Sequence, residues 1–186
     1  YHPEHGEIIG ITSSASDQAI NLEVYSGMDT VEVDFLTFKG GEEHVRVNSH
    51  VGADDVTIIA NLKSSKNVMQ LLMLNDALQR MGCKEIHLVM RYIPYARQDR
   101  VCNPGEALSI KVFADLINTC NFSVVEVIDP HSDVAPALIN NVYLQENYRM
   151  IEDLADRYDV IVAPDAGAVK RTSKMAKEPE IDQVLT

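Results

Sequence analysis

The sequence predicts an α/β fold in which a parallel β-sheet is flanked by helices on both faces. Short apolar runs rich in β-branched residues, such as residues 55–60 and 159–163, alternate with longer runs of helical periodicity. This alternation is typical of parallel strands joined by crossover helices. The chain has 186 residues, of which 46% are hydrophobic, and its three cysteines form no C-x-x-C pair. A chain of this size needs neither disulfides nor a structural metal to fold.

The first part of the chain predicts two strands of the sheet and a hairpin. Residues 7–12 and 55–60 are apolar runs of strand length. Residues 30–35 and 43–47 instead alternate polar and apolar side chains, as half-exposed strands do, and a pair of glycines lies between them. We therefore expect a hairpin over residues 30–47 that projects from the N-terminal domain.

The remaining elements follow from helical periodicity and from residues that begin or end helices. Residues 67–81 carry apolar side chains at helical spacing, with Ser64 and Ser65 as candidate N-cap residues and Gly82 as the terminator. Further strands are expected over residues 85–90, 123–128 and 159–163, and further helices over 107–119, 134–139, 147–157 and 166–177.

Charge and hydropathy narrow the classes of partner. The 16 basic and 28 acidic residues give a net charge of −12. That balance disfavours nonspecific nucleic-acid binding, which depends on lysine and arginine neutralising phosphates. No stretch approaches the roughly 20 apolar residues that span a membrane, and cysteines without a pairing pattern are typical of a reducing compartment. We therefore expect a cytoplasmic protein that binds neither nucleic acid nor membranes.

Three expected strands end in unusually polar segments, which are candidate sites. Ligands of open parallel sheets bind beyond the carboxyl ends of the strands, where loops and helix N-termini meet. The first segment runs from Tyr92 to Arg100, which ends in Arg97-Gln98-Asp99-Arg100. Its two guanidinium groups have the fork geometry that suits phosphate oxygens, and its tyrosines offer a stacking surface. On composition alone, a solvated loop in which Arg97 and Asp99 pair with neighbouring residues fits equally well.

The other two segments offer ligands for a cation. If Asp129-Pro130-His131-Ser132-Asp133 is extended, alternate residues project to one side and bring two carboxylates and an imidazole together. Magnesium uses few protein ligands and several waters, so this trio suits it, and a helix-capping role is the alternative. Asp165, which follows the strand expected over residues 159–163, is likewise either a helix cap or a metal ligand.

The turn of the expected hairpin is a fourth candidate. Phe38 and Glu42 flank a turn that contains Gly40 and Gly41, so a base could approach the backbone closely between a ring and a carboxylate. A plain turn is the alternative. The sequence has neither a P-loop nor a G-x-G-x-x-G fingerprint, which argues against a Walker ATPase and a standard dinucleotide-binding domain.

In this order, the segments resemble the ribose-phosphate diphosphokinases, or phosphoribosyl pyrophosphate synthetases. The family pattern has a phenylalanine hairpin ending in Asp-Gly-Glu, a Met-Glu-Leu-Leu helix, Tyr-Ala-Arg-Gln-Asp-Arg, Asp-Leu-His and Ser-Pro-Asp-x-Gly-x-x-x-Arg. The corresponding segments are Phe38 to Glu42, Met69-Gln70-Leu71-Leu72, Tyr95 to Arg100, Asp129-Pro130-His131, and Ala163-Pro164-Asp165-Ala166-Gly167 with Arg171. The hexapeptide Tyr95 to Arg100 is the most specific match.

The resemblance implies a phosphoribosyltransferase-like fold and a transferase of nucleotide biosynthesis, which moves the diphosphoryl group of ATP to ribose 5-phosphate and gives phosphoribosyl pyrophosphate and AMP. It implies Mg²⁺ as cofactor, with His131 and Asp165 at the metal site. It also implies a homo-oligomer, because the hairpin is lent to the adenine pocket of a neighbouring subunit. The implied ATP-binding residues are Phe38, Gly40, Gly41, Glu42, Arg97, Gln98, Asp99 and Arg100.

Several features depart from the family pattern. Gly40 stands where the family usually has an aspartate. Pro130 and Ser132-Asp133 replace the usual residues around His131, and Ala166 and Ala168 differ around Asp165. The catalytic lysine and arginine of the family belong to a second half that is not recognisable before Thr186, so the catalytic residues are unknown. We expect an N-terminal domain over residues 1–145 and the beginning of a second, similar domain over residues 146–186, inactive without the remainder. A noncatalytic regulatory homologue that binds nucleotide or synthetase subunits is the alternative.

Overall fold

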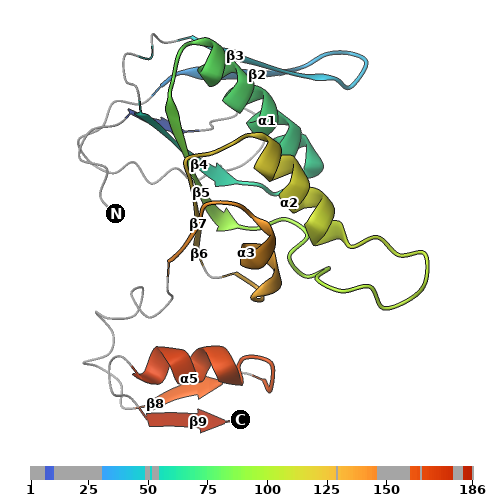
Figure 1. The fold of residues 1–186 in the computed structure, drawn as a ribbon, viewed down its shortest axis with the longest axis vertical. Coiled ribbons are helices and arrows are strands. Elements are labelled where there is room, and N and C mark those ends of the chain that lie inside the picture. Colours follow the sequence, from blue (N-terminus) through green and yellow to red (C-terminus); the bar gives the residue numbers. More distant parts are fainter. Residues whose placement is uncertain are drawn as a thin grey trace. The chain divides into compact units, whose positions relative to one another are not determined.

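The computed structural model describes residues 7–10, 31–48, 51, 55–128, 130–145, 160–163, 165–177 and 182–185. The chain divides into two compact units, Tyr1–Leu144 and Gln145–Thr186. The first unit is built on a sheet with the strand order β1-β4-β5-β6-β7 (Figure 1). No helix in the described ranges is long and apolar enough to cross a membrane.

The sheet of the first unit has the expected parallel pairing. β4 (Asp55–Asn61) pairs in parallel with β1 (Glu7–Gly10) on one side and with β5 (Glu85–Tyr92) on the other, and β5 pairs in parallel with β6 (Val124–Ile128). The α/β fold with a parallel sheet is therefore confirmed. β7 (Val142–Gln145) forms the edge beside β6 and was not predicted.

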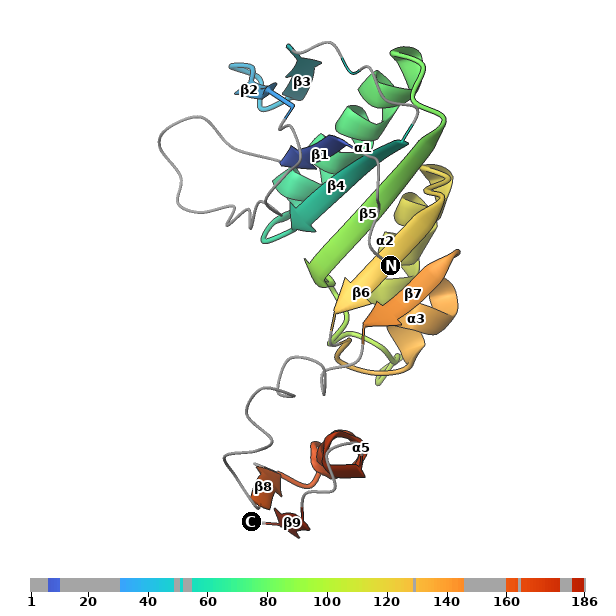
Figure 2. The ribbon, with the colours of Figure 1, turned by 90° about the vertical axis from the view of Figure 1, so that its left-hand side faces the viewer.

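The described helices of this unit share one face of the sheet. α1 (Ser65–Arg80), α2 (Ser109–Thr119) and α3 (Val134–Leu138) all lie on one face of the sheet (Figures 1 and 2). The expectation of helices on the other face as well stays a prediction, because residues 11–30, between β1 and the hairpin, lie outside the described residues. From β4 to β7 each strand lies beside the strand before it, and the order never reverses. Right-handed crossovers in a constant direction place all the connecting helices on the same face.

α1 shows how the local sequence sets the ends of a helix and its buried side. Ser64 Oγ accepts a hydrogen bond from the Asn67 amide at 3.3 Å, which confirms one of the two candidate caps. Gly82 follows the helix with φ of +96°, a conformation that suits a residue without a β-carbon. The apolar side chains of α1 that lie in the core cluster are Val68, Leu71, Leu74 and Leu78. Full burial of each contributes about 1.5–3 kcal/mol.

The expected hairpin is present and packs on α1. β2 (Val33–Thr37) and β3 (Glu43–Val47) are antiparallel, with Val33 opposite Val47 and Thr37 opposite Glu43. β3 contacts α1, and the inward-facing Val33 and Val45 belong to the same core cluster as the sheet. The turn extends away from the sheet (Figure 1). The hairpin turn, which is one candidate site, is therefore attached to α1. This helix precedes β5, which leads into the candidate segment around Arg97.

The second unit contains a strand–helix–strand motif. β8 (Val160–Ala163) and β9 (Asp182–Leu185) are parallel, and α5 (Val169–Lys177) contacts both of them. β8 and α5 occupy the ranges where a strand and a helix were expected, whereas β9 was not predicted. The helix expected over residues 147–157 lies outside the described residues. That this unit begins a second phosphoribosyltransferase-type domain stays a prediction.

Candidate functional site

The segment after β5 forms one wall of an open pocket. The pocket has a volume of about 500 Å³ and is lined by Arg97, Gln98, Arg100, Cys102, Glu106, Ala107 and Ser109. Three of the residues expected to bind ATP are therefore brought together at the carboxyl end of β5. Arg97 is exposed and makes no ion pair with any described residue. Its guanidinium group is available to an anion in the pocket.

Tyr95 directs the chain into this pocket. Its φ is +63°, in the left-handed region that costs a residue with a β-carbon roughly 1–2 kcal/mol. The Tyr95 hydroxyl forms a 2.7 Å hydrogen bond with Ser65 Oγ in the first turn of α1, and its ring lies 6.1 Å from the ring of Phe113 in α2. The Gln98 amide donates to the Tyr95 carbonyl at 2.9 Å and closes the turn. The surrounding contacts thus hold an unfavourable backbone conformation immediately before Arg97.

Asp99 joins the segments that follow β5 and β6. The Ser132 hydroxyl donates a hydrogen bond to the Asp99 carboxylate, and Arg100 Nε donates a second at 3.2 Å. These bonds, with the nearby charges of Arg100 and His131, lower the pKa of Asp99. Only 8% of the Asp99 side chain is exposed, and Asp99 is not among the pocket-lining residues. The polar segments that follow β5 and β6 therefore lie close together, as expected, and Asp99 joins them through its hydrogen bond with Ser132.

The two candidate metal ligands belong to different units. His131 lies in the segment before α3, Asp165 lies in the second unit, and Asp129 is outside the described residues. Asp165 Oδ1 accepts the Ala168 amide at 2.9 Å just before α5, as the capping interpretation predicts. Among the described residues, no three His, Cys, Asp or Glu side chains gather as a resident metal cage requires. Magnesium commonly takes only one or two protein ligands and completes its shell with waters and substrate phosphates, so either side chain by itself is a ligand of a suitable type.

The turn of the hairpin exposes an aromatic ring. The Phe38 amide donates to the Glu42 carbonyl and the Gly41 amide donates to the Phe38 carbonyl, both at 2.8 Å. Gly41 has φ of +88°, which explains a glycine there. Phe38 is 54% exposed, and its ring centroid lies 5.6 Å from that of His44. At Gly40 an added β-carbon would lie 3.5 Å from Glu42 Oε2, which is an ordinary van der Waals contact.

Sequence reasoning missed the far side of the pocket. Glu106 accepts the backbone amides of Cys102 and Asn103 at 3.0 and 3.1 Å, and the Asn103 side chain at 2.6 Å. Hydrogen bonds from Asn103, and then from Cys102, lower the pKa of Glu106. These bonds shape the loop that leads to α2. The polar residues that precede α2 were a signal in the sequence that could have identified this part of the pocket.

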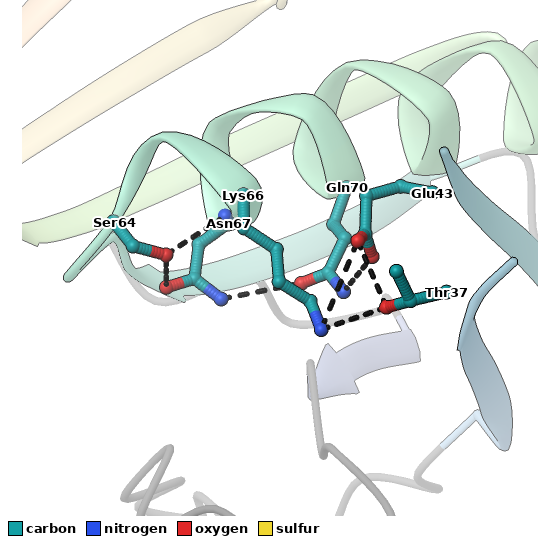
Figure 3. A network of polar contacts seen from close by, with 6 residues as sticks. All are labelled: Thr37, Glu43, Ser64, Lys66, Asn67 and Gln70. Carbon is teal, nitrogen blue, oxygen red and sulfur yellow. Dashed lines mark hydrogen bonds and ion pairs between the residues drawn. The ribbon is translucent and has the colours of Figure 1, made fainter. Parts of the chain in front are cut away.

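A polar network at the base of the hairpin was also missed. It connects β2 and β3 to the first turns of α1 (Figure 3). Its members are Thr37, Glu43, Ser64, Lys66, Asn67 and Gln70. Because these residues are far apart in the sequence, no local pattern indicated the contact.

Comparison with known proteins identifies the family. Residues 8–120 match the family described as the N-terminal domain of ribose phosphate pyrophosphokinase. The chain belongs to the ribose-phosphate pyrophosphokinase family. The motif-based resemblance is thereby confirmed, and so is the phosphoribosyltransferase-like fold, since a solved member of the family shares it. That structure is a phosphoribosylpyrophosphate synthetase from Mycobacterium smegmatis, with a TM-score of 0.69 and 27% identity, covering 85% of this chain and 56% of its own.

This member of the ribose-phosphate pyrophosphokinase family also matches only part of the length of its curated relatives. The ribose-phosphate pyrophosphokinase of Aquifex aeolicus is 30% identical over 91% of this chain and 58% of its own length. That of Hyphomonas neptunium is 32% identical over 82% of this chain and 52% of its own length. The chain thus spans about half the length of the relatives it matches.

Proposed function

We propose that this chain is part of a ribose-phosphate pyrophosphokinase, a transferase that makes phosphoribosyl pyrophosphate and AMP from ATP and ribose 5-phosphate. In that reaction the C1 hydroxyl oxygen of the sugar bonds to the β-phosphorus, the bond between the β-phosphorus and the α,β-bridging oxygen breaks, and the hydroxyl proton is released. The observation that carries the proposal is the pocket at the carboxyl end of β5. In a chain of this family, it presents Arg97, Gln98 and Arg100 together.

The pocket suits this chemistry because phosphoryl transfer depends on positioning and charge stabilisation more than on a covalent nucleophile. Arg97 and Arg100 offer forked donors to phosphate oxygens, and Gln98 offers an amide. These local cations also explain how a protein with a net charge of −12 binds a polyanion, because charges act over only about 8 Å at physiological salt. Asp99 supports the loop from inside by bonding Ser132 and Arg100.

The hairpin turn supplies the base-binding part of the proposal. The exposed ring of Phe38 stacks on the adenine, and Glu42, Gly40 and Gly41 form the rest of this contact. We propose that the hairpin serves the site of a neighbouring subunit in a cytoplasmic homo-oligomer. Mg²⁺ is the proposed cofactor: His131 and Asp165 would hold it together with waters and phosphates, and it would neutralise charge on the transferred group.

A direct assay tests the proposal on the full-length protein. The protein is incubated with ATP, Mg²⁺ and ribose 5-phosphate, and AMP and phosphoribosyl pyrophosphate are quantified. We expect the two products in equal amounts, and none when ribose 5-phosphate is omitted. ADP in place of AMP contradicts diphosphoryl transfer. Nucleotide binding without AMP identifies a regulatory homologue instead.

A further inference from the structure

The Glu43 carboxylate lies where the hairpin turn meets α1, and it is almost fully bonded (Figure 3). Only 8% of its side chain is exposed. Its Oε2 accepts a hydrogen bond from Gln70 Nε2 at 2.8 Å, and its Oε1 accepts one from Thr37 Oγ1 at 2.9 Å. Lys66 Nζ lies 3.8 Å from Oε1 and donates to Thr37 Oγ1 at 2.9 Å. Both carboxylate oxygens are therefore used to join β2, β3 and α1.

The position of this contact along the hairpin gives it a specific consequence. Thr37 and Glu43 are the last register pair before the turn, so they enclose the turn residues 38–42. The turn has only two internal backbone bonds, both involving Phe38. The direction in which Phe38 and Glu42 project therefore depends on how Thr37 and Glu43, the residue pair at the base of the turn, are held.

On the α1 side, the orientation of the Gln70 amide is fixed by further bonds. Gln70 Oε1 accepts a hydrogen bond from Asn67 Nδ2 at 3.2 Å, and Asn67 Oδ1 accepts one from Ser64 Oγ at 2.9 Å. Since the oxygen of Gln70 is used in this way, its NH₂ group faces Glu43. Gln70 is itself buried, so the donated bond is made in surroundings where an unpaired carboxylate is costly.

We infer that Glu43, held by Gln70 and Lys66, is a positioning residue that orients the hairpin turn for the nucleotide. The inference rests on the proposed function, because it assigns the turn to ATP. It goes further by identifying what fixes the turn: one carboxylate on β3 and one amide on α1. Glu43 acts through the turn and does not itself contact substrate.

Exchanging the carboxylate and the amide tests this inference in the full-length protein. Gln70→Glu removes the donor and sets two carboxylates within hydrogen-bond distance, so we expect at least a fivefold rise in KM for ATP near pH 8. The kcat and the KM for ribose 5-phosphate should stay within twofold of wild type. In the double variant Glu43→Gln, Gln70→Glu, the amide and the carboxylate are again opposite each other, so we expect KM for ATP to return to within twofold of wild type.

The pH dependence gives a second readout. Two close carboxylates raise the pKa of one of them, and the protonated form can donate the missing bond. Lys66 is the charged group that faces Glu43 from α1, and the β2 residue there, Thr37, does not titrate. The ratio of KM for ATP between Gln70→Glu and wild type should therefore shrink as pH falls from about 8 to about 6.

Arg80→Gln is the matched control, because it makes the same change in charge on α1 at an exposed ion pair with Asp76, away from the hairpin. Its KM for ATP should equal that of wild type. An unchanged KM in Gln70→Glu, or no recovery in the double variant, overturns the positioning role. Absence of AMP from wild type refutes the proposed function instead. In that case the same comparisons on the Kd for ATP decide the inference.

Discussion

The Ser132 hydroxyl donates a hydrogen bond to the Asp99 carboxylate, and this bond joins the segments that leave two neighbouring strands. Asp99 follows β5 and Ser132 follows β6, which pair in parallel. The carboxyl ends of parallel strands meet at one edge of a sheet, so their loops are near each other. The bond fixes the loop of Arg97 against the loop of His131, and thus one proposed ATP-binding segment against a proposed metal ligand.

Replacing Asp99 by Asn should make stability less dependent on pH in acid. The hydrogen bond from Ser132, then that from Arg100, holds the pKa of Asp99 below its ordinary value of 3.8. The stabilisation is therefore complete above that value and is lost as pH falls through the lower pKa of the folded state. Urea midpoints between about pH 2.5 and pH 6 should decline less steeply for Asp99→Asn than for wild type. Parallel curves contradict this role.

The three cysteines should differ sharply in reactivity. Burial raises the pKa of the Cys120 thiol to about 11, Cys83 is also buried, and Cys102 is exposed at the pocket. The thiolate is the reactive form, so iodoacetamide near pH 8 should modify Cys102 first, as measured by mass spectrometry. ATP should slow this reaction because Cys102 lines the pocket. Modification of Cys120 at a similar rate in the folded protein contradicts the burial of that thiol.

The fold was predictable where local pattern and sheet position agree. β3 has the expected bounds because its alternating side chains face a core on one side only. β7 and β9 were missed because each has four residues and no long apolar run. That α1, α2 and α3 share one face was not predicted, because strand order is a tertiary property that the alternation of elements does not encode.

The two glycines of the hairpin turn should tolerate alanine differently. Gly41 has φ of +88°, so Gly41→Ala should lower the free energy of unfolding by about 1–2 kcal/mol. At Gly40 a β-carbon makes only an ordinary contact with Glu42, so Gly40→Ala should cost less than about 0.5 kcal/mol. Urea unfolding of the two variants makes the comparison. Equal losses contradict the description of the turn.

The core under α1 should be sensitive to truncation. Leu74 is 0% exposed, and Leu74→Ala should lower the free energy of unfolding by about 2–5 kcal/mol through lost burial and a residual cavity. Met69 on the same helix is 45% exposed, so Met69→Ala should change the free energy of unfolding by less than about 0.5 kcal/mol. Similar effects of the two substitutions in urea unfolding contradict the buried face of α1.

The sequence predicted where the candidate site lies in the fold, but it did not predict the contacts between the residues of the site. The polar ends of parallel strands indicated that Arg97 and Ser132 belong to neighbouring loops. The same reasoning could not show that Asp99 bonds inward, because its partner lies on another strand end. Glu43 reads as the polar end of an alternating strand, and its partner Gln70 is 27 residues away. Only the tertiary packing of β3 on α1 reveals that contact.

The central claim is that the loop after β5 binds the triphosphate of ATP, and Arg97 tests it most directly. A charged hydrogen bond contributes about 1.5–3 kcal/mol, so Arg97→Ala in the full-length protein should lower kcat/KM for ATP by more than about tenfold. Arg80→Ala, which removes a guanidinium group exposed on α1, should leave it unchanged. A value for Arg97→Ala equal to that of wild type contradicts the claim.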